Sequence, residues 1–261
     1  MLHRAAYRAL GLTGWTYQAI ECDEAHLPSL LAGCDASWAG LSLTMPLKRA
    51  VLPLLDHTDP LATKVGAANT VVFTEGRRHG HNTDVPGMIA ALAAHCVTAT
   101  SLPPGAEVLI LGAGATACSA LAAARELGIT QVTVAARDPA RTTPLRAAAD
   151  RLNIKITLTP YADPPVTTPD LLISTVPPTA ADIYAQRLTA RTLRPHAVLD
   201  VVYHPWPTPL ATAATQTGAT VAPGFSLLLH QAALQVELMT GKSAPLEAMR
   251  TAGLAGLQGR G

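Results

Sequence analysis

Charged residues are scarce in this sequence, and no segment concentrates them. Lys, Arg, Asp and Glu together make up 14% of the 261 residues, and the formal net charge is +1. Nucleic acids are attracted by a basic field, which a nearly neutral chain without charged blocks does not provide. We therefore expect no nucleic-acid partner.

Cysteines and long apolar runs are also few. The four cysteines form no C-x-x-C pair and have no histidine at ligand spacing, so we expect neither a metal site nor a disulfide framework. No apolar stretch approaches the ~20 residues that span a bilayer, and the first twelve residues lack the apolar core of a signal peptide. These features predict a cytoplasmic protein with no membrane partner.

Strand-like and helix-like patterns alternate over the first hundred residues. The hydrophobic content of 49% is enough for a core in each of two domains. A polar stretch with two prolines at 98–107 indicates a boundary after this α/β segment. The apolar runs typical of strands lie at 15–22, 38–45 and 69–73, and the helical patterns lie at 2–12, 46–55 and 85–95.

The rest of the chain begins with a strand, a helix and a second strand, and then continues the alternation. This pattern predicts an α/β fold with two α/β domains, the second built on a mostly parallel, doubly wound sheet. We expect a first domain at 1–99, a second at 100–224, and C-terminal helices at 225–261 that pack back on the first domain. The expected strands lie at 108–114, 131–137, 156–158, 171–175 and 197–203, and the expected helices at 115–128 and 226–241.

A G-x-G-x-x-A pattern joins the first strand of the second domain to its helix. The first glycine allows the tight turn, the second lets a pyrophosphate approach the backbone, and the helix N-terminus offers free N–H groups. Tight packing alone is the alternative explanation, but the position within a strand-turn-helix-strand unit favours a dinucleotide. The residues are Gly112, Ala113, Gly114, Ala115, Thr116 and Ala117.

The end of the second strand of this unit indicates which dinucleotide is bound. An acid there binds the ribose 2′-hydroxyl of NAD, whereas a cation accommodates the 2′-phosphate of NADP. Arg137 ends the strand and Arg141 follows four residues later, so two guanidinium groups can converge on one phosphate. Asp138 lies between them and could bind a ribose 2′-hydroxyl, so NAD is an alternative cofactor. A further alternative is that both arginines are solvated and bind no phosphate. The pattern favours NADP as the cofactor.

Three further stretches, GLSLTMPLK at 40–48, GAANTVV at 66–72 and GHNTDVPG at 80–87, resemble signatures of the shikimate dehydrogenase family. DVVYHPWPTPL at 200–210 and GFSLLLHQAALQVELMTG at 224–241 extend the resemblance over nearly the whole chain, in order. The resemblance implies a Rossmann-like cofactor domain and NADP-dependent, reversible reduction of 3-dehydroshikimate to shikimate, a step of aromatic amino acid biosynthesis. It also implies a small-molecule partner and a monomer or homodimer.

The resemblance marks Lys48 and Asp84 as the catalytic pair. Hydride reduction of a ketone creates an alkoxide, and a lysine beside a carboxylate can supply the proton that this oxygen needs. Read alone, Lys48 would be a surface lysine and Asp84 a helix N-cap. Only the combination of motifs favours catalysis.

The resemblance assigns further residues to substrate and cofactor. Ser42 stands where the family commonly has Asn, and Asn82 and Thr83 have the alternative role of holding the turn that presents Asp84. We expect the histidines to be structural or solvated. The implied substrate residues are Thr44, Asn69, Tyr203 and Gln231, and the implied cofactor residues beyond the glycine-rich turn and the arginines are Thr175, Val201 and Gly224.

The family commonly opens with a strand and a turn carrying G-x-P-I-x-H-S-x-S-P, whereas this sequence begins at the helical pattern 2–12. A late start codon and a truncated chain both explain the difference. We expect the chain as given to lack one strand of its first domain, and to bind NADP well but shikimate poorly. The alternatives to the leading function are an NAD-preferring quinate/shikimate dehydrogenase and a non-catalytic, ligand-sensing relative.

Overall fold

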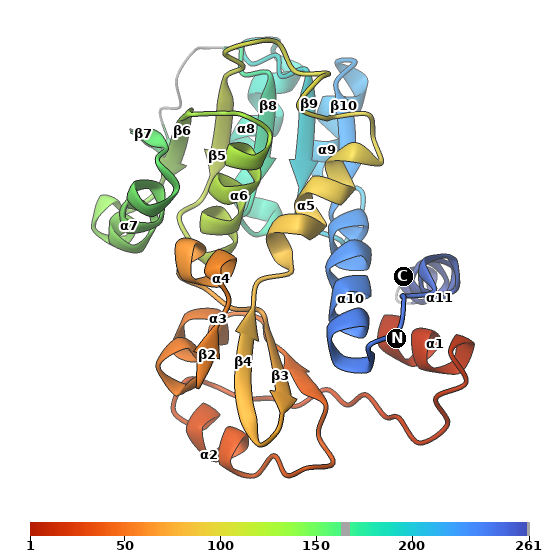
Figure 1. The fold of residues 1–261 in the computed structure, drawn as a ribbon. Helices are drawn as coiled ribbons and strands as arrows, with labels where there is room; N and C mark the ends of the chain where they lie inside the picture. Colours follow the sequence, from red (N-terminus) through yellow and green to blue (C-terminus); the bar gives the residue numbers. More distant parts are fainter. Residues whose placement is uncertain (163–167, 260–261) are drawn as a thin grey trace. The chain divides into compact units, whose positions relative to one another are not determined.

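The computed structural model describes residues 1–162 and 168–259, apart from the side chain of Arg141. The chain forms two compact units, which we call unit 1 (Met1–Gly87 with Leu229–Gly261) and unit 2 (Met88–Leu228). The chain passes from unit 1 to unit 2 within helix α5 (Asp84–Ala93) and returns within helix α10 (Gly224–Thr240) (Figure 1). Residues Leu229–Gly261 therefore group with the N-terminal part of the chain.

Unit 1 contains a mixed sheet whose strands follow the order β1-β3-β4-β2. Strands β3 and β4 form a hairpin whose turn residues, Glu75 and Gly76, both have positive φ, as tight hairpin turns require. Strand β1 pairs antiparallel with β3, and β2 pairs parallel with β4. The strands are β1 (Gly40–Ser42), β2 (His57–Thr58), β3 (Thr70–Thr74) and β4 (Arg77–His81).

Short helices cover this sheet and bury an aliphatic core. Leu27 and Leu31 of α2 pack with Leu41 of β1 and Val71 of β3, because each presents its apolar side to the same interior. The helices of unit 1, besides α5 and α10, are α1 (Leu2–Ala9), α2 (Leu27–Ala32), α3 (Leu47–Ala50), the 3-10 turn η1 (Leu52–Leu54), α4 (Pro60–Val65) and α11 (Leu246–Gln258).

The strand predicted at 15–22 is wrong. The structure has no regular element there, because the segment pairs with no strand among the described residues, and a strand exists only through its ladder of hydrogen bonds. One carbonyl oxygen of the segment is bound by a side chain instead of by a strand: Arg4 Nε and Nη2 donate to the backbone oxygen of Tyr17 at 2.9 and 2.7 Å. Residue pattern alone does not reveal whether a ladder partner is present.

Unit 2 contains a parallel sheet with the strand order β10-β9-β8-β5-β6-β7. Every neighbouring pair in it is parallel. The order reverses between β5 and β8, which makes this point the topological switch of a doubly wound sheet, where ligands bind. The strands are β5 (Val108–Leu111), β6 (Gln131–Ala136), β7 (Lys155–Pro160), β8 (Leu171–Ser174), β9 (Ala197–Asp200) and β10 (Thr220–Pro223).

Helices lie on both faces of this sheet, with α6 on one face and α8 on the other (Figure 1). Helix α6 is rich in alanine, and its buried Ala117, Ala120 and Ala124 let it approach the strands closely. The predicted α/β class is confirmed. The helical segments of unit 2 are α6 (Ala115–Glu126), η2 (Pro139–Thr142), α7 (Thr143–Leu152), η3 (Pro178–Ala181), α8 (Asp182–Thr189) and α9 (Pro209–Gln216).

The buried His3 of α1 makes the stability of unit 1 depend on pH. Its ring stacks on Tyr17 with 4.1 Å between ring centroids, and its Nε2 has no hydrogen-bond partner within the described residues. Burial lowers the pKa of His3 from 6.5 to about 4 and outweighs the opposing effect of Gln235. The folded chain therefore keeps His3 neutral at a pH at which the unfolded chain protonates it.

We predict that the free energy of unfolding falls as the pH drops from 6.5 towards 4, because the unfolded state then binds the extra proton. The contribution of His3 is on the order of 3 kcal/mol. Urea denaturation of the wild type and of His3→Gln across this range measures it. The variant should lose less stability on acidification, and identical slopes for both proteins would contradict the prediction.

Candidate active site

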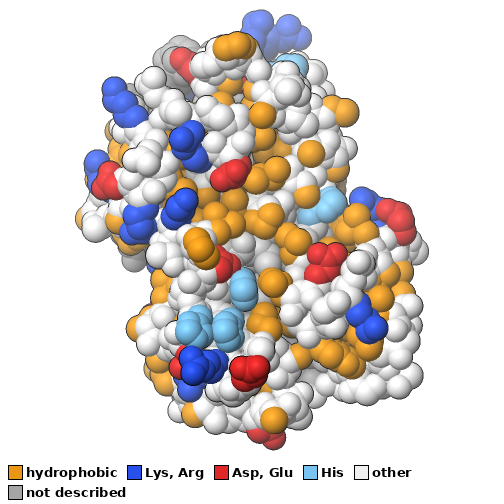
Figure 2. Space-filling model, in the orientation of Figure 1, with side chains coloured by type: hydrophobic (Ala, Val, Ile, Leu, Met, Phe, Trp, Pro, Cys, Tyr) orange, Lys and Arg blue, Asp and Glu red, His pale blue; other side chains and the backbone are white. Residues whose placement is uncertain are grey.

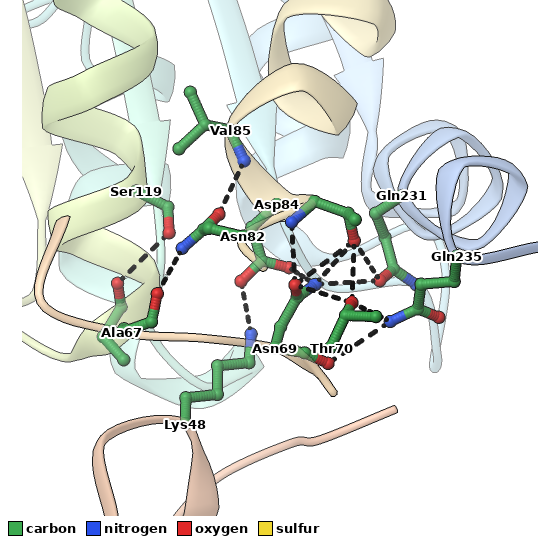
Figure 3. A network of polar contacts seen from close by, with 12 residues as sticks. Lys48, Ala67, Asn69, Thr70, Asn82, Asp84, Val85, Ser119, Gln231 and Gln235 are labelled. Carbon is green, nitrogen blue, oxygen red and sulfur yellow. Dashed lines mark hydrogen bonds and ion pairs between the residues drawn. The ribbon is translucent and has the colours of Figure 1, made fainter. Parts of the chain in front are cut away.

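The side chains of Lys48 and Asp84 meet in unit 1. Lys48 Nζ donates to Asp84 Oδ2 at 2.6 Å, and the two side chains are only 14% and 7% exposed. Lys48 lies on the short helix α3, and its backbone oxygen accepts from the N–H of Ala68, just before β3, at 2.8 Å. The sequence-predicted pair is therefore brought together as a nearly buried ion pair (Figure 3).

Asp84 is the first residue of α5, but its carboxylate does not cap the helix. Asn82 does so instead, because its Oδ1 accepts from the backbone N–H of Val85 at 3.1 Å while its Nδ2 donates to the carbonyl oxygen of Ala67 at 2.9 Å. Asn82 thus satisfies an N–H group that the helix start leaves unpaired. Both oxygens of Asp84 remain available to other groups.

Asn69 supplies the second contact to the carboxylate. Its Nδ2 donates to Asp84 Oδ1 at 2.9 Å, and its Oδ1 accepts from the backbone N–H of Thr83 at 2.8 Å. Because a backbone N–H can only donate, this bond fixes which end of the amide faces Asp84. The Asn69 backbone is held as well, by Leu43 N donating to its oxygen at 2.7 Å and by its own N–H donating to His81 O at 3.0 Å.

Gln231 of α10 completes the group. Its Oε1 accepts from Asn69 Nδ2 at 3.1 Å, and its side chain is half-buried. Helix α5 comes close enough because Gly87 has no side chain: a Cβ there would lie 2.9 Å from the Cβ and 3.0 Å from the backbone N of Gln231. The four side chains of Lys48, Asn69, Asp84 and Gln231 therefore form one polar cluster, which we call the catalytic cluster after the role that the sequence predicts for Lys48 and Asp84.

Two other predicted substrate residues lie outside this cluster. Thr44 is exposed in the loop before α3, where its backbone oxygen accepts from Leu47 N at 2.8 Å. Tyr203 belongs to unit 2 and is 41% exposed on the loop after β9. That loop is held by the buried Asp200, which accepts from Thr208 Oγ1 at 2.6 Å. Burial raises the pKa of Asp200, and the bond from Thr208 offsets part of this rise.

Several residues that sequence reasoning did not single out also shape the cluster. Gln235 lies one helical turn after Gln231, and this spacing of two amides in an apolar helix is the signal that could have found it. Asp59 caps α4 through Ala62 N and also accepts from His81 Nδ1 at 3.1 Å. Burial alone would raise the pKa of Asp59, but these hydrogen bonds outweigh it and hold the pKa below its ordinary value.

In unit 2 the glycine-rich turn lies at the switch point of the sheet. Gly112 follows β5 with φ +102°, and a Cβ there would lie 2.7 Å from Oγ1 of Thr175, which follows β8. Gly114 precedes α6, and within the described residues it gives the helix start no side-chain cap. The first N–H groups of this 12-residue helix are thus left for a ligand. The turn fits the pyrophosphate of a dinucleotide.

The residues after β6 are those that would contact the ribose 2′-phosphate, or the 2′-hydroxyl, of such a ligand. Arg137 is exposed at the strand end, and the side chain of Arg141 lies outside the described part of the chain. The carboxylate of Asp138 accepts from Ala140 N at 2.9 Å as the cap of η2. Because this bond draws Asp138 into the turn, the cation at 137 is the more available group. Elsewhere in unit 2, a Cβ at Gly224 would overlap the backbone of Val201, so these two predicted residues are neighbours.

Histidines and arginines gather over β2 and β4 (Figure 2). His57 and His79 are register partners whose rings stack at 4.8 Å, and Arg77 Nη1 contacts His57 Nε2 at 3.2 Å. Across the described residues no group of three or more His, Cys, Asp or Glu side chains is arranged to hold a metal ion. Likewise, no described helix is long and apolar enough to cross a membrane.

The parallel sheet with a glycine-rich turn at its switch point defines a protein with a dinucleotide-binding fold. A family model of the shikimate dehydrogenase substrate binding domain matches residues 1–71, and one of the shikimate 5′-dehydrogenase C-terminal domain matches residues 224–252. The chain belongs to the shikimate dehydrogenase family.

Individual relatives support this assignment over nearly the full length. A shikimate dehydrogenase (NADP(+)) of Natronomonas pharaonis is 36% identical over 260 residues, which are 96% of this chain and 91% of the relative. The crystal structure of the Mycobacterium tuberculosis shikimate dehydrogenase has a TM-score of 0.84 at 40% identity, covering 97% of this chain and 93% of that one. The Thermus thermophilus shikimate 5-dehydrogenase, in complex with NADP(H) and shikimate, has a TM-score of 0.82 at 31% identity, covering 98% and 93%.

We predict that Gly87→Ala lowers the free energy of unfolding by about 1–2 kcal/mol. The new methyl meets the Cβ and backbone of Gln231 rather than a flexible side-chain end, so its overpacking cost exceeds the gain in helix propensity. Gly14→Ala, which meets open space among the described residues, is the control. Urea denaturation of both variants is the measurement, and a Gly87→Ala protein as stable as the wild type would contradict the close approach.

Proposed function

We propose that this chain catalyses the NADP-dependent, reversible reduction of 3-dehydroshikimate to shikimate. The contact of Lys48 with Asp84, enclosed by Asn69 and Gln231, is the observation that carries the proposal. Reduction of a ring ketone needs one proton donor and several hydrogen-bonding groups for hydroxyls, and this cluster offers both. The relatives named shikimate dehydrogenase (NADP(+)) support the same reaction.

Each side chain of the catalytic cluster has a role in this proposal. Lys48 Nζ gives a proton to the substrate oxygen as it changes from carbonyl to hydroxyl, and takes one back in the reverse direction. Asp84 holds the Lys48 ammonium in place through its Oδ2. Asn69 and Gln231, together with Thr44 and the Tyr203 phenol, bind the substrate hydroxyls and carboxylate. The exposed position of Thr44 leaves its hydroxyl accessible to a ligand.

The residues of unit 2 fit the cofactor. When bound, NADPH supplies the hydride that the carbonyl carbon receives. The backbone of residues 112–116 would hold the pyrophosphate at the start of α6, and Arg137 with Arg141 would hold the 2′-phosphate. Thr175 would lie beside the pyrophosphate, and Val201 and Gly224 beside the nicotinamide.

An NAD-preferring quinate/shikimate dehydrogenase is the second candidate. Asp138 favours it, because an acid at a strand end can bind a ribose 2′-hydroxyl. The Listeria monocytogenes shikimate 5-dehydrogenase, 26% identical, was crystallised with shikimate and NAD. The engagement of Asp138 with Ala140 N makes us favour NADP. A non-catalytic sensor is disfavoured, because binding alone has no use for a lysine held against a carboxylate.

We also propose a cytoplasmic location and a monomeric or homodimeric state. None of the four cysteines, all of which lie among the described residues, forms a disulfide, and this suits a reducing compartment.

Initial rates with shikimate or quinate and with NADP⁺ or NAD⁺ test the function. We expect the highest kcat/KM for shikimate with NADP⁺. A preference for NAD⁺ would favour the second candidate, and no turnover of either substrate with either cofactor would favour the sensor.

We predict that Lys48→Ala lowers kcat by about 10²–10⁴-fold with little change in the KM for shikimate, because an acid/base group acts mainly in the transition state. Lys64→Ala, which changes an exposed lysine of α4, is the control. Steady-state kinetics separate the two constants. A Lys48→Ala enzyme with near-normal kcat would remove Lys48 from the mechanism.

We predict that Arg137→Ala raises the dissociation constant of NADP⁺ by roughly 10–100-fold and that of NAD⁺ far less, since only NADP⁺ carries the 2′-phosphate. Arg146→Ala, an exposed arginine of α7, serves as the matched control. Calorimetric titration of both cofactors is the measurement. Equal losses for the two would show that Arg137 does not bind the 2′-phosphate.

A further inference from the structure

Two glutamines on helix α10 differ sharply in their surroundings. Gln231 is half-buried and belongs to the catalytic cluster, whereas Gln235, one turn later, is only 1% exposed. Its neighbours Ala232 and Val236 on the same helix are buried too. A side chain so enclosed does not reach a ligand itself, so any effect of Gln235 on the reaction must pass through the residues that it contacts.

Both ends of the Gln235 amide are bound. Its Oε1 accepts from Ser42 Oγ at 2.9 Å, and its Nε2 donates to Thr70 Oγ1 at 3.0 Å and to the backbone oxygen of Asn69 at 3.3 Å. Ser42 and Thr70 are register partners on the neighbouring strands β1 and β3. Gln235 therefore joins these two strands to helix α10 at the point where β3 begins (Figure 3).

The directions of these bonds lead to the carboxylate of the catalytic cluster. Because the Thr70 hydroxyl accepts from Gln235, its own hydrogen is directed to Asn69 Oδ1, 3.1 Å away. Asn69 then turns its Nδ2 to Asp84 Oδ1 at 2.9 Å. The donors run in one sense, from Gln235 through Thr70 and Asn69 to Asp84, and chains of this kind reinforce one another.

Ser42 lies at the far end of this chain of hydrogen bonds. Its short side-chain hydroxyl donates to Gln235 Oε1 from strand β1. The amide is thus fixed from β1 and from β3.

We propose that Gln235 is a positioning residue of the reaction, which acts through Thr70 and Asn69 to hold Asp84 against Lys48. This inference rests on the proposed function and adds to it a residue that does not touch the substrate. Its loss disturbs the geometry of the catalytic cluster while leaving the cofactor residues of unit 2 intact. Misplacing a catalytic group by about 1 Å is costly, because the reacting atoms must be closely aligned.

The test compares Gln235→Met, which keeps the size but loses both polar ends, with Thr70→Val, which removes the link, and with the double variant. We expect each single change to lower kcat/KM for shikimate by about tenfold or more, with the KM for NADP⁺ within about twofold of the wild type. The double variant should be no worse than the poorer single variant, because both changes cut the same chain. Gln258→Met, at an exposed site on α11, is the control.

The side-chain amide signal of Asn69 in ¹⁵N NMR spectra gives a readout that does not need turnover. A shift of this signal in Gln235→Met and Thr70→Val, but not in Gln258→Met, supports the positioning role. This holds even if the wild type does not turn over shikimate, because that result contradicts only the proposed function. Losses that multiply in the double variant, or an unchanged signal together with a kcat/KM within twofold of the wild type, would overturn the role of Gln235. If Gln235→Met does not fold, Thr70→Val alone must show both effects.

Discussion

The ion pair of Lys48 and Asp84 is the interaction on which the arrangement of unit 1 depends. Two charges that are 14% and 7% exposed are tolerated only when each is paired and their remaining hydrogen-bonding capacity is filled. The surrounding structure meets this demand: Asn69 fills the second oxygen of Asp84, and Asn82 caps α5 so that the carboxylate need not. Removal of one partner would leave an uncompensated charge, so stability and chemistry rest on the same contact.

In unit 2 the candidate site is an anion site, and it is built from backbone geometry rather than from charged side chains. At the switch point between β5 and β8, the positive φ of Gly112 and the absence of a Cβ beside Thr175 allow a turn that leads directly into α6. The helix start then offers N–H groups to an anion, and no charged side chain has to be buried there. In the proposed function, unit 1 therefore holds the proton donor and unit 2 binds the phosphates of the cofactor.

The sequence predicted those parts of the fold whose signal is local. The strand-turn-helix-strand of unit 2 and the long helix α10 follow from periodicity and glycine, and the motifs imply the pairing of Lys48 with Asp84. Strand β4, Arg77–His81, was not predicted because its residues are polar and only the hairpin with β3 makes it a strand. For the segment 15–22 the error is the reverse: the residue pattern predicts a strand, but the segment forms no ladder of hydrogen bonds with another described strand. The contacts of Gln235 could not be predicted from the sequence, because its partners Ser42 and Thr70 are far away along the chain.

In the proposed function, NADPH gives a hydride to one carbon of a cyclic substrate and NADP⁺ takes it back in the reverse direction, while Lys48 exchanges the proton. The most direct measurement uses shikimate that carries deuterium on the carbon bearing the oxidised hydroxyl, mixed with NADP⁺ and the purified chain, with the nucleotide product analysed by mass spectrometry. We expect the deuterium to appear in the reduced nucleotide, and we expect Lys48→Ala to slow its appearance. Reduced nucleotide formed without the label, or label transfer that is as fast in Lys48→Ala as in the wild type, would contradict it.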